Sequence, residues 1–264
     1  MQLNLNPSIK LHYEVSGQSG GPTFLLFNGA SLPLDFWGPF AEKLGELGRV
    51  IRFDQRNSGK TEYSGTFTLG DIAADAIALL DEVNAEQVIA IGHAWGGRVA
   101  QVFARDYPKH LSHLVIIGTG GQFAPIDMRH IATPLLQAKK DRDRKAWEPL
   151  FEAMWFGEGF SQRDGKTFQE IVSFMWDYQP PKTAVWNRDA YPSTGYWGTA
   201  TVPTLLVYGS EDKNGTVDNA NHLHEQLANS TLVMIDHAGH FVVREHHERV
   251  VDEIKNFIDI RPTQ

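Results

Sequence analysis

The segment from residue 88 to residue 106 places the strongest constraint on the fold of this chain. Val88-Ile89-Ala90-Ile91 is a continuous apolar run, Gly92-His93-Ala94-Trp95-Gly96-Gly97 is a corner of mostly small residues, and apolar residues then recur at helical spacing. The pattern predicts a strand, a very tight turn and a helix. Such a turn strains its central residue, and the flanking glycines let the two backbones approach closely. That central residue is Ala94.

The spacing of Gly92 and Gly96 around Ala94 resembles the nucleophile elbow, G-x-S-x-G, except at its centre. Alanine has no hydroxyl, thiol or carboxylate, so this chain cannot form a covalent intermediate at position 94. Either an active form has serine here and the chain is an inactivated serine-to-alanine variant, or a natural relative has lost or replaced the chemistry. We favour the first explanation because the other expected catalytic parts are present.

Composition excludes several classes of function. A length of 264 residues suits one large domain with an insertion, and a net charge of −8 without a long basic cluster argues against a nucleic-acid partner. The chain has no cysteine, which excludes a disulfide framework and a thiolate nucleophile. No leader-like segment or apolar run of membrane-spanning length occurs, so we expect a cytoplasmic protein with no membrane partner.

Apolar strands alternate with helical segments along most of the sequence. A helix is expected from about residue 35 to residue 48, and Thr68 with Asp71 predicts the capped start of another helix. Alternation of this kind predicts a mostly parallel α/β sheet flanked by helices. The expected strands are Ile9–Val15, Phe24–Phe27, Val50–Asp54, Val88–Ile91, Leu114–Ile117, Thr204–Tyr208 and Thr231–Ile235.

The alternation breaks between residues 126 and 198, where the sequence is helical in pattern and contains five of the seven tryptophans. We predict a core of residues 1–125 and 199–264 with a helical cap at 126–198. The aromatic residues either build the cap's own core or line an apolar pocket over the site. The predicted pocket residues are Trp37, Trp147, Met154, Trp155, Trp176, Trp186 and Phe241.

Candidate catalytic residues follow the last two predicted strands. In an open parallel sheet, ligands bind at the carboxyl ends of the strands. Asp212 follows one of these strands and His240 follows the other, so both can meet Ala94 at the same edge. Glu211 is the alternative acid and His237 the alternative histidine.

The order of these residues resembles the α/β-hydrolase superfamily over essentially the whole chain. That family has its serine first, then an acid in a G-x-x-D loop, then a histidine in a G-H turn, and Gly209-x-x-Asp212 and Gly239-His240 match. The resemblance implies an eight-stranded, mostly parallel sheet. It also implies that His240 transfers the proton, that Asp212 orients His240, and that the N–H groups of Ala30 and Trp95 form an oxyanion hole.

Three other motifs receive less weight. Residues 54–61 resemble the D-x-R-G-x-G-x-S turn of the same superfamily, with Asn57 and Thr61 as departures, and fail the pattern of a phosphate-binding loop. Glu245-His246-His247-Glu248 is not expected to bind metal because adjacent helical residues point apart. We interpret His93 as a packing residue of the corner.

The sequence therefore predicts a serine hydrolase for a small apolar or aromatic ester or lactone, represented by an alanine variant and needing no cofactor. A non-catalytic ligand-binding protein is the main alternative. Carbon–carbon bond hydrolysis, cofactor-free dioxygenation and proline-iminopeptidase-like amidase activity, with Glu148, Glu152 and Glu158 as candidate amine ligands, stay open. The expected partner is a small-molecule substrate, and homodimer formation also stays open.

Overall fold

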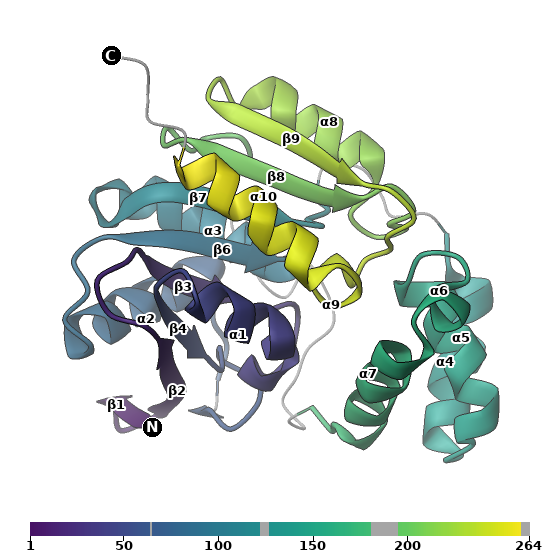
Figure 1. Cartoon of the computed structure of the whole chain (residues 1–264). Coiled ribbons are helices and arrows are strands. Elements are labelled where there is room, and N and C mark those ends of the chain that lie inside the picture. The colour runs from purple at the N-terminus through teal and green to yellow at the C-terminus, as the bar shows by residue number, and fades with distance from the viewer. Residues whose placement is uncertain (64, 122–126, 181–194, 260–264) are drawn as a thin grey trace.

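A computed structural model describes residues 1–63, 65–121, 127–180 and 195–259. Its centre is a mixed sheet in the order β1-β2-β4-β3-β6-β7-β8-β9, and the two-residue strand β5 pairs with β2 beside this path (Figure 1). Along that path, each strand from β4 to β9 runs parallel to its neighbour. Strand β2 pairs antiparallel with both of its neighbours, β1 and β4. The seven strands expected from the sequence are thus present, β1 completes the eight that the family resemblance implies, and β5 is an addition.

The central strands of the sheet are short and largely buried. All six residues of β6 and of β8 are buried, as expected for strands covered on both faces. The strand bounds are β1 Gln2–Asn6, β2 Ile9–Gly17, β3 Thr23–Phe27, β4 Arg49–Phe53, β5 Glu62–Tyr63, β6 Val88–His93, β7 Leu111–Ile117, β8 Thr204–Gly209 and β9 Ser230–Ile235.

Helices cover both faces of the sheet (Figure 1). The short helices α1 (Gly38–Gly45) and α9 (Val242–Glu245) and the longer α10 (His247–Asp259) contribute to one buried cluster. The other face carries α2 (Leu69–Glu82), α3 (Trp95–Asp106) and α8 (Val217–Gln226), which contribute to the second cluster. The predicted cap of α2 is observed, since Thr68 and Asp71 exchange side-chain to backbone hydrogen bonds. Two 3₁₀ turns, Leu34–Trp37 and Pro108–His110, complete the core elements.

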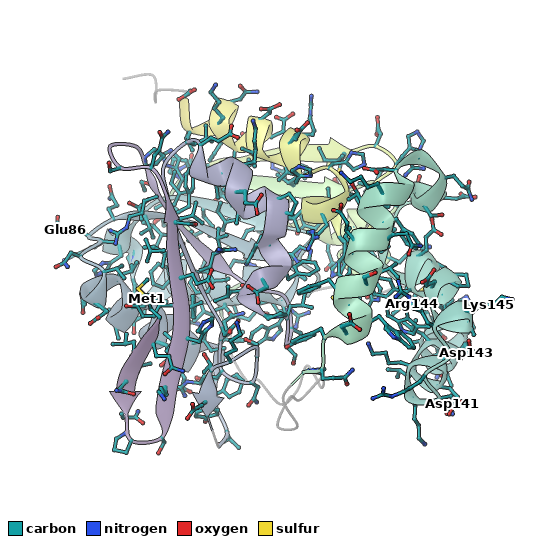
Figure 2. The ribbon with its side chains drawn as sticks, turned by 60° about the horizontal axis from the view of Figure 1, so that its bottom comes forward. Met1, Glu86, Asp141, Asp143, Arg144 and Lys145 are labelled. Atoms are coloured by element: carbon teal, nitrogen blue, oxygen red, sulfur yellow. The ribbon has the colours of Figure 1, made fainter. Side chains whose placement is uncertain are left out.

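Four helices in the described part of the segment between β7 and β8 lie at one end of the molecule, beyond the carboxyl ends of the parallel strands (Figure 1). They are α4 (Arg129–Lys140), α5 (Arg144–Trp155), α6 (Phe160–Arg163) and α7 (Gly165–Asp177). Asp141, Asp143 and Lys145 are exposed at the outer end of this helical layer, away from the sheet (Figure 2). Its inner side packs on the first core cluster through residues such as Phe151 and Phe156.

Strand register brings the functional segments to one edge. Gly92 of β6 pairs with Phe27 of β3, and the next residue of β6 pairs with Ile117 of β7. On the other side, Gly209 at the end of β8 pairs with Ile235 at the end of β9. The loops that follow these strands therefore start at the same edge of the sheet. Within the described ranges, no helix combines the length and the apolarity needed to cross a membrane.

Candidate active site

The corner between β6 and α3 has the strained geometry predicted from its sequence. Ala94 has φ 53° and ψ −118°, a conformation that side-chain-bearing residues rarely adopt. Its N–H donates to the carbonyl of Ile117 at 2.8 Å, and its own carbonyl accepts from the Thr119 hydroxyl at 2.9 Å. These bonds to the neighbouring strand end hold the Ala94 methyl group in a fixed position at the corner.

Glycine is required on both sides of this corner by space rather than by dihedral angle. A Cβ on Gly92 would lie 2.5 Å from the carbonyl oxygen of Gly96, and a Cβ on Gly96 would lie 2.0 Å from that of Phe27. Both distances are far below van der Waals contact. The two glycines therefore allow α3 to start directly against the ends of β6 and β3, which exposes the residue between them.

Asp212 and His240 form a buried pair. The Nδ1 atom of His240 lies 3.0 and 2.9 Å from the two carboxylate oxygens of Asp212, and the N–H groups of Asn214 and Gly215 donate to Oδ1 of Asp212 at 2.7 and 2.9 Å. A carboxylate held in this way accepts a hydrogen bond from Nδ1–H, which leaves Nε2 as the unprotonated nitrogen of a neutral ring. The arrangement can move a proton at Nε2.

The alternative acid and histidine form a separate pair. Glu211 accepts from the N–H of Glu158 at 2.6 Å and lies 3.2 Å from Nδ1 of His237. The N–H donor of Glu158 and then the His237 ring hold the pKa of the Glu211 carboxyl below its usual range. The His237 side chain is 75% exposed. This pair therefore joins the β8 loop to the helical layer at the surface, and Asp212 with His240 is the buried pair.

His93 connects the corner to His240. Its Nε2–H donates to the backbone carbonyl of His240 at 2.8 Å, and the two imidazole rings are 5.2 Å apart between centroids. Burial, and secondarily the nearby His240, lower the pKa of His93 to about 3. The ring is therefore neutral at pH 7 and packs against Phe36 and Trp37. Because His93 precedes Ala94, this bond keeps the His240 turn beside the corner.

Glu245 is a buried residue whose role the sequence did not reveal. Its two carboxylate oxygens accept from the N–H groups of Gly239 and Gly157, both at 2.9 Å. Gly239 precedes His240, and Gly157 belongs to the helical layer just after α5. Burial raises the pKa of the Glu245 carboxyl to about 8, against the effect of the two N–H donors. Glu245 therefore ties the histidine turn to the helical layer.

The raised pKa of Glu245 predicts a pH-dependent stability. The Glu245 carboxyl keeps its proton up to about pH 8 in the folded protein, whereas the unfolded chain releases it near pH 4.5. The contribution of this group to the free energy of unfolding is therefore full at low pH and is lost as the pH rises through about 8. Between pH 6.5 and 8 we expect the free energy of unfolding to fall by about 1–2 kcal/mol. Urea unfolding at several pH values measures it.

Glu245→Gln is the matched variant, because the amide does not titrate. This variant should be less stable overall, since its NH₂ group faces a backbone N–H donor. Above pH 6.5, however, its free energy of unfolding should change much less with pH than that of the unaltered chain. His93 does not affect this comparison, because its neutral form prevails in both states above pH 6.5. An unchanged slope in Glu245→Gln would assign the pH dependence to other groups.

The two predicted oxyanion residues border one small cavity. Ala30 and Trp95 line a space of about 10 Å³ together with Gln55 and three other residues. The loop that carries Ala30 is held by Asn28, whose amide donates to the carbonyl of Phe53 at 3.0 Å and accepts from the Trp37 indole at 2.6 Å. The asparagine side chain thus sets the position of this loop from within the core.

Tyr178, at the end of α7, supports the same loop from the helical layer. Its hydroxyl donates to the carbonyl of Ser31 at 2.6 Å and accepts from the N–H of Gly59 at 3.3 Å. Ser31 has φ 55°, which is uncommon for a residue other than glycine. No sequence motif indicated Tyr178, because its partners lie more than 100 positions away.

The structure separates the predicted pocket residues into two groups. Trp155 stacks on Phe241 with ring centroids 5.4 Å apart, and its ring lies 5.5 Å from that of His240. Trp37 and Trp147 are 0% and 4% exposed. They pack as core residues, because the Trp37 indole bonds Asn28 and Trp147 stacks on Phe151.

The remaining predicted pocket residues are not placed at the site. Met154 and Trp176 are partly buried against the first core cluster. Trp176 packs edge-on to Trp147, and Lys139 lies over both indoles, which makes this group a core of the helical layer. Trp186 lies outside the described residues. Of the predicted aromatic lining, Trp155 and Phe241 are the side chains that the structure brings beside His240.

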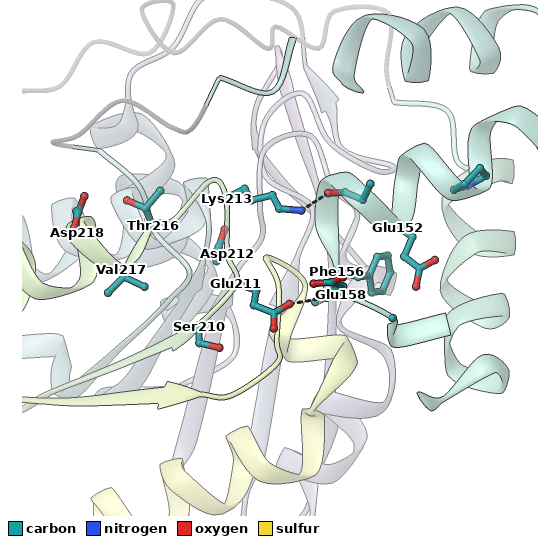
Figure 3. Close-up of a pocket in the computed structure, with 14 residues that line it drawn as sticks. Glu152, Phe156, Glu158, Ser210, Glu211, Asp212, Lys213, Thr216, Val217 and Asp218 are labelled. Carbon is teal, nitrogen blue, oxygen red and sulfur yellow. Dashed lines mark hydrogen bonds between the residues drawn. The ribbon is translucent and has the colours of Figure 1, made fainter. Parts of the chain in front are cut away.

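A broad groove of about 800 Å³ lies between α5 with the turn that follows it and the loop from β8 to the start of α8 (Figure 3). Lys213 crosses it and donates to the carbonyl of Ala153, and Glu211 bonds the N–H of Glu158. Asp212 is among its lining residues, whereas the described lining does not include Ala94 or His240. The groove therefore reaches the Asp212 loop from its outer side.

Comparison with known proteins identifies the family. Residues 24–253 match the alpha/beta hydrolase family, so the chain belongs to that family and the predicted fold class is confirmed. "Putative carbamate hydrolase RutD" of Variovorax paradoxus is 27% identical over 237 residues, covering 87% of this chain and 89% of that protein. "Putative esterase/lipase" of Haemophilus influenzae is 25% identical over 252 residues, covering 94% and 86%.

A solved structure supports the same assignment of the fold. The enol-lactonase from Burkholderia xenovorans superposes with a TM-score of 0.73 at 19% identity, covering 95% of this chain and 96% of that one. An identity this low bears on the fold alone. By their names these relatives are hydrolases, and the bonds that they cleave differ.

Proposed function

We propose that this is the site of a serine-type hydrolase for esters or lactones of small apolar or aromatic molecules, and that alanine at position 94 replaces the serine of the active form. The observation that carries the proposal is the buried Asp212–His240 pair, tied by His93 to a strained corner whose central residue lacks only a hydroxyl. A carbonyl-cleaving hydrolase needs a base whose ring is oriented by an acid and held beside a fixed nucleophile.

The proposed mechanism assigns one step to each residue. With serine at position 94, Nε2 of His240 takes the hydroxyl proton as Oγ attacks the carbonyl carbon, and Asp212 stabilises the imidazolium that results. The N–H groups of Ala30 and Trp95 hold the oxygen that becomes negative. His240 then returns the proton to the leaving alcohol. In the second half, a water molecule attacks the acyl carbon while Nε2 of His240 takes its proton, and the proton passes to Oγ of residue 94 as the acid is released.

The substrate class follows from the side chains beside His240. Trp155 and Phe241 form a stacked aromatic wall next to the imidazole. An apolar or aromatic acyl or alcohol group fits such a wall, because its burial there is favourable and leaves no polar group unpaired. Two of the three carboxylates that the amidase alternative could use are engaged elsewhere, since Glu152 accepts from Ser161 and Glu148 pairs with Arg144, whereas Glu158 is exposed at the groove.

A panel of substrates tests the bond type in Ala94→Ser. We expect hydrolysis of p-nitrophenyl butyrate and of dihydrocoumarin, an aromatic lactone, and no measurable cleavage of the matching p-nitroanilide. Anilide cleavage at a rate similar to that of the ester would support the amidase alternative instead. Binding of these compounds without turnover of any of them would contradict the proposal.

Ala94 itself favours a second candidate, a protein that binds a ligand without converting it. In that case alanine is the natural residue and the apolar site serves recognition alone. The codon for residue 94 in the native gene separates the two candidates: a serine codon supports the hydrolase, and an alanine codon supports the binding protein.

A further inference from the structure

Gln55 has a buried acceptor that no described group satisfies. The residue is 1% exposed, and its Nε2 donates to the backbone carbonyl of Asn28 at 2.8 Å. Because that carbonyl can only accept, the amide orientation is fixed and Oε1 must face the other way. Within the described chain, Oε1 has no hydrogen-bond partner. A buried acceptor without a donor costs about 1–3 kcal/mol, so a donor from a ligand or solvent is expected there.

The residue that carries this acceptor lines the small cavity beside the proposed oxyanion hole. Gln55 lines the same space of about 10 Å³ as Ala30 and Trp95. This volume admits one group the size of a water molecule. If the N–H groups of Ala30 and Trp95 hold the carbonyl oxygen of a substrate at the edge of this space, the one group that the space admits would come from the carbon next to the carbonyl and would lie near Gln55.

The other polar residues of the cavity do not supply the missing donor. The Arg56 guanidinium makes two hydrogen bonds to Asp75, at 2.6 and 2.8 Å, and the Ser58 hydroxyl donates to the backbone carbonyl of Gln55 at 2.7 Å. The described lining of this space contains no carboxylate, so nothing there would balance the charge of an ammonium group. A neutral donor, rather than an ammonium group, is therefore the complement of Gln55.

The surrounding loop is rigid enough to hold such an acceptor in place. Asp54 accepts from the N–H groups of Leu34 and Lys60, at 2.6 and 2.7 Å, and Asn57 takes the left-handed conformation with φ 62°. Asparagine tolerates that conformation better than most residues. The position of Gln55 is thus fixed before a ligand binds.

We propose that Gln55 Oε1 recognises a hydroxyl group on the carbon next to the scissile carbonyl, so that the preferred substrates are α-hydroxy esters or lactones. This inference rests on the proposed function, since it takes the N–H groups of Ala30 and Trp95 as the carbonyl-binding site. An ester without the hydroxyl leaves Oε1 unpaired or forces a water into the cavity, and it binds more weakly for that reason.

The test uses the chain with Ala94, which cannot turn the ester over by the proposed route. Calorimetry with ethyl mandelate and ethyl phenylacetate, which differ by the α-hydroxyl, should give an affinity about 10- to 100-fold higher for mandelate. In Gln55→Met, which has similar length but no strong acceptor, the affinity ratio should fall to about one. Loss of the bond to Asn28 could displace the loop, but this would weaken both esters and leave the ratio informative.

Gln55→Glu is the matched control, because it keeps an oxygen acceptor and should retain the preference for mandelate. A ratio near one in the unaltered chain, a ratio unchanged in Gln55→Met, or binding of neither ester would overturn the inference. Inactivity of Ala94→Ser together with a Gln55-dependent preference in binding would instead contradict the proposed function alone.

Discussion

Ala94→Ser is expected to raise the rate of p-nitrophenyl ester hydrolysis about 10⁴- to 10⁶-fold over the unaltered chain, which is the range lost when a hydrolase loses its nucleophile. The gain is large because the base, its orienting acid and the strained corner are already in place. A serine hydroxyl adds one oxygen to the methyl group of Ala94 and needs no change of backbone. Steady-state kinetics at pH 7 measures the change.

Ala94→Gly is the control for this prediction. Glycine also relieves the strain of the positive φ at the corner, but it supplies no hydroxyl. Its rate should therefore stay at the level of the alanine chain. Equal rates in the serine, glycine and alanine forms, with circular dichroism showing that all three are folded, would contradict the assignment of position 94.

Asp212→Asn in the Ala94→Ser background is expected to lower the hydrolysis rate about 10⁴-fold. Two backbone N–H groups donate to Oδ1 of Asp212, so the amide oxygen of asparagine should take that position and its NH₂ group should face His240. The NH₂ group can only donate, so Nδ1 of His240 must accept and Nε2 must carry the proton. The ring then cannot take the proton of the serine hydroxyl.

Glu211→Gln is the matched control for Asp212→Asn, because Glu211 is the adjacent acid in the same loop. Its carboxylate bonds Glu158 and His237 rather than His240, so we expect its rate to stay within about threefold of the parent, which corresponds to less than 1 kcal/mol. A loss in Glu211→Gln as large as that in Asp212→Asn would move the acid to position 211.

Local patterns in the sequence were sufficient for the parts of the site that follow strands. The glycine spacing around Ala94 predicted the corner because a Cβ at either glycine would collide with backbone atoms. Asp212 and His240 were predicted as a pair because each follows a strand that ends at the same edge. These inferences depend on backbone geometry, which short-range sequence patterns encode.

Side-chain contacts between distant segments could not be predicted in the same way. Trp37 belongs to a residue type that is common in apolar pockets, yet its indole N–H donates to the Asn28 side chain in the core. The helix expected from about residue 35 begins as a 3₁₀ turn, and α1 starts only at Gly38, whose φ of 40° separates the two. Glu245 sits in an apparent metal motif, and its role emerged only from its bonds to Gly157 and Gly239.

The central claim is that position 94 is a nucleophile site served by His240, and covalent labelling tests it most directly. Treating Ala94→Ser with a fluorophosphonate and measuring the intact mass and the tryptic peptides should show one phosphonyl group, located on residue 94. The unaltered chain should gain no mass, and Ala94→Ser with Asp212→Asn should react far more slowly. An unlabelled Ala94→Ser protein that is folded, or a label on another residue such as Ser210, would contradict the claim.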